Sequence, residues 1–350
     1  SKANVELRNF YFNRDFRQDT ASQSKQEEWA QGFLMRYVSG YTEGTVGVGF
    51  DAIGMFGLKL DSSPDRSGSG LLPRSIESPR RAQDDYSKLG ATAKLRVSKS
   101  VVKIGTLMPK LPTVQSNDSR LLPQSFQGGQ LNSMEIDGLT LDAGQLKQIN
   151  LRDSSNNEDM TISSGGARGI IVRGGQTSDE FNFASLNYKW NKDISTSYSY
   201  GGLDGLYKQN IVNFIHILPL DEKQQFKSDL RYARSTDDGN SNVDNTALGA
   251  MFTYAFYGHQ LGLGYQKMIG DTGYAYINGS DPFLVNFVQI GDFSNKEERS
   301  WQARYDFNFE SVGIPGLTFM TRYISGDNVD LGSGRPSGKE WERHMDIAYV

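Results

Sequence analysis

Apolar and polar residues alternate along many segments of this chain, and this period of two is the feature that most restricts its fold. In 301–309, Trp301 and Tyr305 fall on one face of an extended strand, whereas Gln302 and Arg304 fall on the other. Successive side chains of a strand point to opposite faces, so the pattern predicts a strand with one apolar and one polar face. The same split recurs in 91–98, 184–190 and 317–323.

Alternation of this kind predicts strands along the whole chain. We expect them at 4–13, 28–39, 43–60, 86–98, 100–108, 134–142, 145–152, 180–190, 194–201, 206–217, 224–233, 245–256, 259–268, 298–309, 316–325 and 341–350.

The connections between these strands alternate in length. Short ones lie near 40–42, 99, 143–144, 191–193, 218–223, 257–258 and 310–315. Long ones lie at 14–27, 61–85, 109–133, 153–179, 234–244, 269–297 and 326–340, and 202–205 is short where a long one is due. Tight turns at one end and extended loops at the other are typical of a transmembrane antiparallel β-barrel. A β-sandwich does not require this alternation, and we find no sequence repeat of the kind a β-solenoid needs.

Composition agrees with a strand-built membrane protein. The chain has no run of 18 apolar residues, which excludes a transmembrane helix. Its mean hydropathy is −0.53, as expected when only every second strand residue meets lipid. The absence of cysteine suits passage through an oxidising compartment. A net charge of −4 argues against nucleic acid as a partner.

The last predicted strand ends at Val350 without a closing hairpin. An open sheet edge cannot face lipid, because its backbone groups would lack partners. Either the barrel therefore has sixteen strands, or a final hairpin is missing from this chain. We expect 1–350 to form a single transmembrane barrel domain of the bacterial outer membrane, in contact with its lipid and lipopolysaccharide, with a water-filled lumen.

The third long connection is unusually apolar for a loop. Residues 108–126 contain three prolines and several leucines, which favour a stiff, extended backbone that packs against a surface. Folded into the barrel, this loop would narrow the pore and place Asn117, Asp118 and Arg120 at the constriction. The alternative is an external cap over the mouth. The seventh long connection is similarly apolar around Asp281 in 279–287, so the same inward fold is expected there.

Six stretches resemble the OprD family of outer-membrane carboxylate channels of pseudomonads, in order along nearly the whole chain. They are LRNFYFNRD (7–15), WAQGF (29–33), GTVGVGFDA (44–52), SRLLPQ (119–124), ERSWQARYD (298–306) and PGLTFM (315–320).

The resemblance implies a monomeric, eighteen-stranded barrel, and hence a truncated final hairpin. It also implies an eyelet formed by the inward-folded third and seventh loops, and a ladder of basic side chains that guides the substrate carboxylate. Arg14 and Arg120 match arginines of that site, and Asp281 matches its seventh-loop acid. The ladder of the family extends into its last strands, so the residues named here are an incomplete set.

Further basic residues are candidates for the channel wall. Lys94, Arg96, Arg304 and Arg322 have polar neighbours two positions away and apolar alternates, so we expect them to face the lumen. Arg8 shares a face with Arg14, but Phe10 and Phe12 lie on that face too, so its direction is ambiguous. Each of these cations could instead form an ion pair that only braces the wall. For Arg120 the corresponding alternative is a salt bridge to Asp118.

A row of such cations would select anions. Two unit charges about 4 Å apart interact by roughly 1 kcal/mol in bulk water and about 4 kcal/mol at an effective dielectric near 20. Several moderate sites let a carboxylate step through, whereas one deep site would trap it. An acid such as Asp118 or Asp281 could hold an ammonium or guanidinium group on the same substrate.

These features predict passive, cofactor-free diffusion of small solutes, and the resemblance implies that the solutes are small carboxylates, either basic amino acids and peptides or aromatic and other organic acids. The main alternative is a structural or adhesive barrel whose long loops bind a partner. A membrane-embedded hydrolase is the third hypothesis. No enzyme is expected, because His216, His259 and His344 are scattered without metal-ligand spacing or a neighbouring nucleophile motif.

Overall fold

A computed structural model describes every residue except 18–20, which belong to the expected long connection 14–27. The described residues form only β-structure apart from two short 3-10 helices, η1 (Arg173–Gly175) and η2 (Phe309–Val312). In the described part of the chain, no helix is both long enough and apolar enough to cross a membrane. The strands are β1 (Lys2–Asp15), β2 (Lys25–Val38), β3 (Val46–Asp61), β4 (Asp85–Val97), β5 (Ser100–Leu107), β6 (Lys110–Leu111), β7 (Val114–Gln115), β8 (Ser125–Ser133), β9 (Leu139–Asn150), β10 (Phe181–Lys189), β11 (Ile194–Leu203), β12 (Tyr207–Asp221), β13 (Gln224–Asp237), β14 (Asp244–Phe256), β15 (His259–Ile269), β16 (Arg299–Asn308), β17 (Leu317–Val329) and β18 (Gly338–Tyr349).

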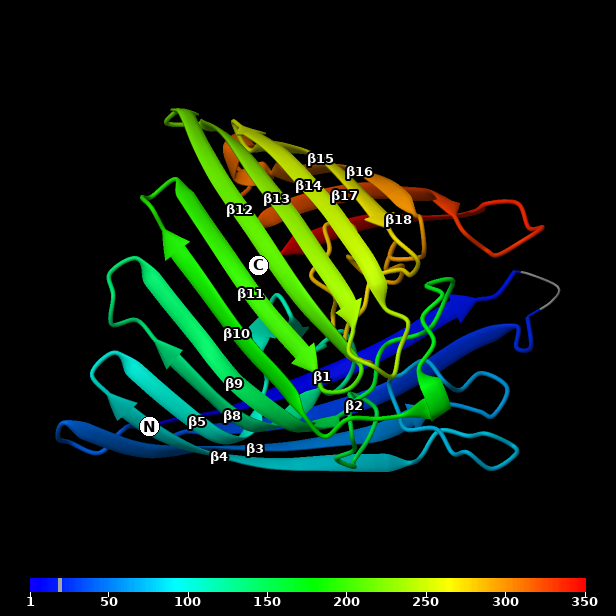
Figure 1. The fold of residues 1–350 in the computed structure, drawn as a ribbon, viewed down its shortest axis with the longest axis horizontal. Coiled ribbons are helices and arrows are strands. Elements are labelled where there is room, and N and C mark those ends of the chain that lie inside the picture. Colours follow the sequence, from blue (N-terminus) through cyan, green and yellow to red (C-terminus); the bar gives the residue numbers. More distant parts are fainter. Residues whose placement is uncertain (18–20) are drawn as a thin grey trace. The chain divides into compact units, whose positions relative to one another are not determined.

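Sixteen of these strands form one antiparallel sheet in chain order, as predicted (Figure 1). The remaining two, β6 and β7, pair with each other inside the third long connection. Each main strand between β1 and β18 pairs with the main strands before and after it in the sequence, as expected of antiparallel strands joined by consecutive hairpins. The strand count expected from alternation is therefore confirmed.

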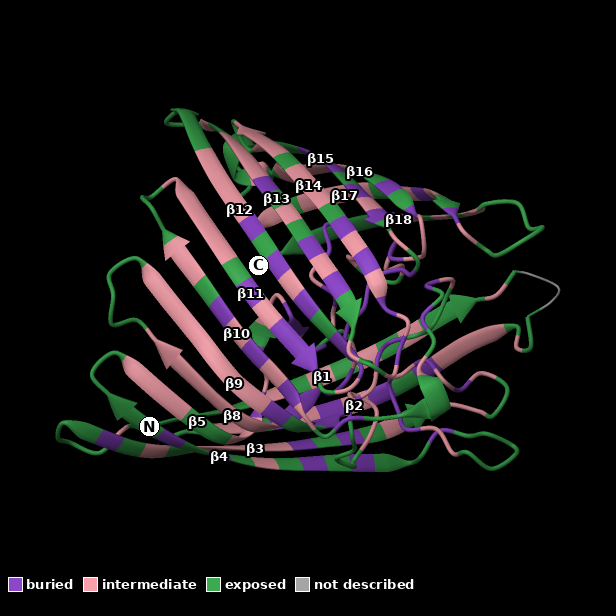
Figure 2. Cartoon of the chain, viewed as in Figure 1, coloured by how far each residue is buried: buried purple, intermediate pink, exposed green. Residues whose placement is uncertain are grey.

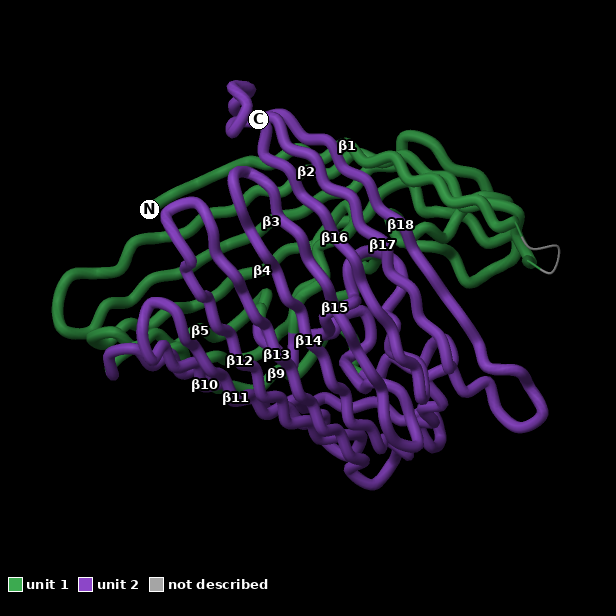
Figure 3. The backbone as a smooth tube through the Cα atoms, turned by 90° about the horizontal axis from the view of Figure 1, so that it is seen from above, with its two compact units in different colours: residues 1–110, 115–135, 143–160 green, residues 111–114, 136–142, 161–350 purple. Residues whose placement is uncertain are grey.

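The chain divides into two compact units (Figure 3). Unit 1 comprises 1–110, 115–135 and 143–160, and it contains β1 to β5, β8 and most of β9. Unit 2 comprises 111–114, 136–142 and 161–350, and it contains β10 to β18.

One pair of strands differs from the prediction. We expected strands at 134–142 and 145–152 with a turn at 143–144, but the structure has β8 and β9 with a turn at 134–138. The polar, glycine-rich start of β8 has the composition of a loop, which explains the error. A side chain at Gly128 would come within 2.2 Å of the Gln145 carbonyl oxygen of β9, so this glycine permits close strand approach. The third long connection accordingly ends at 124.

The predicted two-faced strands are confirmed. In β16, Trp301 is 48% exposed and Gln302 is 3% exposed. Exposed and buried residues follow one another along strands of unit 2 such as β12 and β13 (Figure 2). Gln302 donates to the Val285 carbonyl oxygen and to Asn286 Oδ1 of the seventh long connection, at 3.3 and 3.0 Å. The polar face therefore carries the loop, and the exposed apolar face is the one suited to lipid.

The same rule resolves the ambiguity in β1. Leu7 and Tyr11 are exposed on one face, whereas Phe10 and Phe12 pack against a buried cluster on the other. Arg8 and Arg14 share the inner face with these two rings because they have the same parity. The phenylalanines lie under a loop, so their apolar character does not indicate lipid contact.

The third long connection packs against the wall of unit 1, as predicted. Leu121 and Leu122 are fully buried with Leu34, Leu72 and Tyr86 in a cluster that the wall strands and the second long connection share. Gly32 of β2 makes room for this packing, since an added Cβ would lie 3.2 Å from the Leu121 side chain. The loop is thus seated by hydrophobic burial on a glycine-lined part of the wall.

The seventh long connection is seated in the same way within unit 2. Tyr274, Tyr276 and Leu284 pack with residues of β12 to β15 in a second buried cluster. An added Cβ on Gly249 of β14 would come within 2.9 Å of the Val285 side chain. Asn286 is fully buried and donates its side-chain amide to Ser300 Oγ at 2.8 Å.

We predict that Leu121→Ala loosens the third loop without unfolding the sheet. Removing this fully buried side chain should cost about 2–5 kcal/mol of packing free energy, felt mainly by the loop that it anchors. Trypsin cleavage after Arg120 should then accelerate, while heat-modifiability on gels still reports a folded barrel. Leu263→Ala, on the exposed face of β15, is the matched control and should leave the cleavage rate unchanged.

Candidate functional site

Arg8 of β1 is clamped by acids. Its guanidinium donates to both carboxylate oxygens of Asp118 in the third loop, at 2.5 and 3.1 Å, and to Glu6 Oε1 at 2.5 Å. It also approaches the Arg120 and Leu121 carbonyl oxygens at 3.5 and 3.4 Å. A charge-assisted, two-pronged pair of this kind fixes geometry as well as energy. Arg8 therefore ties the third loop to the wall, and its charge is balanced.

The environment of Arg120 differs from the salt bridge that would only brace the third loop. Asp118 pairs with Arg8, so the alternative of an Arg120–Asp118 salt bridge is wrong. Arg120 Nε donates to the Ser69 carbonyl oxygen at 3.2 Å, and its guanidinium carbon lies 4.7 Å from the Phe12 ring centre. Among the residues that the structure describes, no carboxylate forms an ion pair with it.

Burial, together with the charges of Arg152 and Arg14, lowers the pKa of Arg120 to about 10. Arg120 still carries its charge at neutral pH. A cation that is partly desolvated and surrounded by like charges is more stable when an anion joins it. Arg14, Arg120 and Arg152 thus form a basic cluster at the third loop, here called the basic trio.

Arg152 was missed by the sequence analysis. It follows β9 and donates to Asn117 Oδ1 at 3.1 Å and to Ser119 Oγ at 2.8 Å, both in the third loop. Tyr86 donates to the Arg152 carbonyl oxygen at 3.3 Å, which helps to hold its backbone. No sequence signal places Arg152 beside Arg120, because the two residues meet only through the folding of separate loops.

Lys88 braces the two loops that carry this cluster. It is buried, and its ammonium group donates to the Pro123 and Leu151 carbonyl oxygens at 3.1 and 2.5 Å. A single side chain of β4 therefore joins the third loop to the segment that follows β9. This contact helps to position Arg120 and Arg152.

Lys94 and Arg96 also lie on the inner face of β4, but near its short-turn end. Lys94 is buried, pairs with Asp51 at 2.6 Å and donates to the Ser39 carbonyl oxygen at 2.9 Å. The guanidinium of Arg96 lies 4.5 Å from the Tyr41 ring centre. Both contact the 39–45 turn region instead of the third loop. Lys94 forms an ion pair that braces the wall, which was the alternative to a role in the channel.

In unit 2, Arg304 and Arg322 face each other across β16 and β17. Arg304 pairs with Asp306 through two contacts of 2.7 Å. Arg322 instead contacts His344 Nδ1 at 3.1 Å, and its Nε atom is buried without a hydrogen-bond partner in the described structure. The two arginines were expected on one face and lie there, but only Arg304 has a neutralising acid among the described residues.

Asp281 is half-buried in the seventh loop, beside residues that anchor that loop. Arg231 of β13, which the sequence analysis did not single out, stacks 4.0 Å from the ring centre of Phe283 and pairs with Asp229 at 2.8 Å. Within the described residues, no group of three His, Asp or Glu side chains is arranged to hold a metal ion.

The end of the seventh loop contains a buried acid, Glu298. Its Oε2 accepts from the backbone and side-chain nitrogens of Asn295 at 2.9 and 2.8 Å, and Asn295 also donates to Glu340 at 3.0 Å. Burial and then the nearby charge of Glu340 raise the pKa of Glu298 to about 8. The folded loop therefore favours the protonated form of the Glu298 carboxyl group.

We predict that neutralising Asp118 with Asp118→Asn makes the pore expected from the sequence more selective for anions. The change removes a negative charge and leaves Glu6 as the one acidic partner of Arg8 among the described residues. Reversal potentials in planar bilayers under a KCl gradient should shift towards the chloride potential. Asp84→Asn, which alters an exposed acid paired with Lys59, is the control; equal shifts in both variants would contradict the clamp.

We predict that the end of the seventh loop loses stability as pH rises. The folded pKa of Glu298 is raised, so its contribution is full below the ordinary carboxyl pKa near 4.5 and declines up to about pH 8. Hydrogen exchange at the Asn295 amide, normalised to Glu298→Gln at each pH, should accelerate over that range. Glu222→Gln, in an exposed turn, should retain the wild-type dependence. A wild-type profile parallel to that of Glu298→Gln would contradict the assignment.

Comparison with known proteins agrees with this architecture. The model of the family described as "outer membrane porin, OprD family" matches residues 1–350. Porin D of Pseudomonas aeruginosa is 38% identical over 375 residues, which cover 100% of this chain and 82% of that protein. Among solved structures, Pseudomonas aeruginosa OpdQ is 66% identical with a TM-score of 0.91, covering 99% of this chain and 87% of that one. OpdK of the same species, crystallised with vanillate, is 38% identical with a TM-score of 0.89 over 99% and 88% of the two chains. The chain belongs to the OprD family of outer-membrane porins.

Proposed function

We propose that this porin passes small carboxylate-bearing nutrients by passive diffusion, with the basic trio as its main carboxylate contact. The observation that carries the proposal is that Arg120 is charged and partly buried, has no ion-pair partner among the described residues, and is held by a loop seated on the wall. A preorganised cation binds an anion without first giving up another partner. Family membership supports the porin part of the proposal.

The division of the cations into balanced and unbalanced ones supports a stepwise path. Arg8, Lys94 and Arg304 are paired with acids, so they brace the wall. Elsewhere in unit 1, Arg36 pairs with Glu6 at 2.8 Å and lines a hollow of about 260 Å³ together with Lys103 and Asp51. In unit 2, Arg322 has the environment of an unbalanced cation. Several moderate anion contacts, instead of one deep one, suit a channel that must also release its substrate.

For the substrate class, we propose aromatic and other simple organic acids ahead of basic amino acids. Asp118, which could have held an ammonium group, is occupied by Arg8. The Phe12 ring below Arg120 offers a flat apolar surface beside the cation. A related porin, OpdK, was crystallised with vanillate, an aromatic carboxylate. Asp281 remains the candidate contact for a cationic substrate group.

We predict that Arg120→Ala lowers benzoate uptake into liposomes by about ten-fold, the loss expected for one charge-assisted contact. Conductance in 1 M KCl, where Debye screening shortens charge effects to about 3 Å, should change much less. Arg80→Ala, at an exposed site in the second long connection, is the control and should leave uptake unchanged. Equal losses of uptake and conductance in Arg120→Ala would mean that Arg120 only shapes the pore.

Two further measurements separate the alternatives. Faster uptake of arginine than of benzoate by wild-type protein would contradict the proposed substrate class while leaving the carboxylate site intact. A purified barrel that passes no ions in planar bilayers would favour the structural or adhesive role instead.

A further inference from the structure

Two guanidinium groups of the basic trio, those of Arg120 and Arg152, lie side by side. Both donate to the same hydroxyl oxygen, Ser119 Oγ, at 3.4 Å from Arg120 Nη1 and 2.8 Å from Arg152 Nη1. Arg120 otherwise donates to the Ser69 and Ser119 carbonyl oxygens, and Arg152 donates to Asn117 Oδ1. In the part of the chain that the structure describes, neither arginine forms an ion pair with a carboxylate. Two positive charges are therefore adjacent and have only neutral groups in contact.

The folded loops hold this pair in place. The third loop, which carries Arg120, is seated on the wall by the fully buried Leu121. Lys88 donates to the Leu151 carbonyl oxygen at 2.5 Å and so holds the segment that carries Arg152. Like charges repel, and burial followed by the charge of Arg152 lowers the pKa of Arg120 to about 10. Loop packing therefore maintains an arrangement of charges that becomes more stable when an anion binds.

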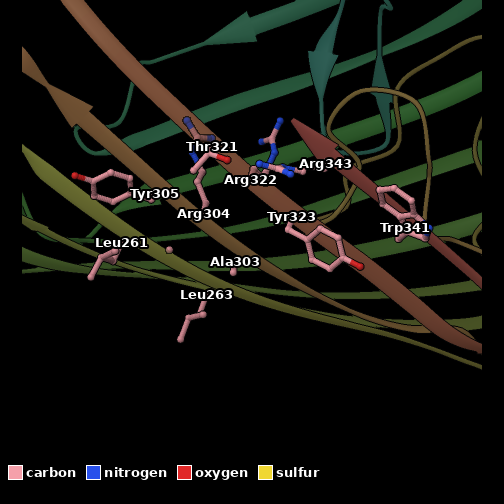
Figure 4. A pocket seen from close by; sticks show the side chains of 11 residues that line it. Leu261, Leu263, Ala303, Arg304, Tyr305, Thr321, Arg322, Tyr323, Trp341 and Arg343 are labelled. Carbon is pink, nitrogen blue, oxygen red and sulfur yellow. The ribbon is translucent and has the colours of Figure 1, made fainter. Parts of the chain in front are cut away.

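The facing arginines of unit 2 differ from this pair. Arg304 and Arg322 lie opposite each other on β16 and β17 (Figure 4). Asp306 pairs with Arg304 through two contacts of 2.7 Å, so one of these two positive charges is already balanced. A single negative charge on a ligand would balance the other. At Arg120 and Arg152, by contrast, two negative charges are needed.

Asp153 is the acid next to this pair in the sequence, and it offsets the positive charge only in part. Its charge acts on the pKa of Arg120 in the opposite direction to that of Arg152, and less strongly. Asp153 is half-buried and forms no ion pair with either arginine among the described residues. The two guanidinium groups therefore keep a net attraction for anions.

We infer that Arg120 and Arg152 together select dicarboxylates whose carboxylates are close together, one on each guanidinium group, over monocarboxylates of the same size. The inference rests on the proposed carboxylate function and specifies its substrate class. A guanidinium group binds a carboxylate through two parallel hydrogen bonds. Coulomb attraction is proportional to the charge of the anion, so a dianion gains about twice as much from the same two cations. Because both guanidinium groups contact one hydroxyl oxygen, a short dicarboxylate such as phthalate spans them.

The test is inhibition of benzoate uptake into liposomes that contain the porin, at neutral pH and low ionic strength. Phthalate and its monomethyl ester have similar shapes, but phthalate carries two negative charges and the ester carries one. Phthalate should reach half-inhibition of wild-type protein at an about ten-fold lower concentration than the ester, the gain from one more charge-assisted contact. Terephthalate, whose carboxylates lie at opposite ends of the ring, should have no such advantage over its own monomethyl ester.

Two variants test the roles of the charges. Arg152→Gln removes one positive charge and keeps an amide that can donate to Asn117 and Ser119, so the ten-fold advantage of phthalate should fall to about two-fold or less. Asp153→Asn removes the offsetting acid and should increase that advantage. Arg80→Gln, in the exposed second long connection, is the control and should leave it unchanged. Heat-modifiability on gels checks that each variant is folded.

The possible failures are distinguishable. If wild-type protein takes up benzoate but phthalate and its ester inhibit equally, the inference is overturned and the proposed function stands. An undiminished advantage of phthalate in folded Arg152→Gln would also overturn it. So would stronger inhibition by inorganic phosphate than by phthalate, which would indicate a site for compact oxyanions. No benzoate uptake by folded wild-type porin would contradict the proposed function, and the inference with it.

Discussion

The two-residue period of the strand is the constraint on which the rest of this structure depends. Each main strand is hydrogen-bonded to its neighbours in the sequence, so the direction of every side chain follows from its parity. One parity gives an exposed apolar face, exemplified by Leu7 and Trp301. The other gives a polar face on which loops rest, exemplified by Arg8 and Gln302. The register of the strands therefore determines where the loops pack, which charged side chains line the inner wall and which apolar side chains face lipid.

On the inner face, the chemistry depends on which cations are balanced. Arg8 and Arg304 are each held by an acid at hydrogen-bond distance, so their positive charge contributes little to a passing anion. Arg120 donates to a carbonyl oxygen and Arg322 contacts a histidine nitrogen instead, so neither forms an ion pair with a carboxylate among the described residues. The clamp on Arg8 also fixes the loop that carries Arg120. The ion-paired Arg8 thus helps to hold Arg120, the arginine that we propose contacts the substrate.

The sequence predicted the strands well because alternation is a local property. It failed at 125–133, where glycines allow β8 to approach β9 closely and the segment has the composition of a loop. It could not orient β1, because Phe10 and Phe12 pack under a loop instead of facing lipid. The sequence indicated Arg120 as a candidate site residue, because it lies in the apolar third loop and matches an arginine of the resembled family. It missed Arg152, whose place depends on contacts between distant segments.

The wall glycines beneath the two loops mark where each loop packs against the wall. Gly32 lies beneath Leu121, Gly249 and Gly264 beneath Val285, and a Cβ on Gly326 would clash with Glu298 at 2.1 Å. A bulkier residue at one of these wall positions would prevent the loop from seating there, even with the loop sequence unchanged. The width of such a channel can therefore evolve through single substitutions in the wall, leaving the arginines of the basic trio unchanged. In other porins of this architecture, glycines on the inward-facing parity of a strand then indicate which part of the wall carries a loop.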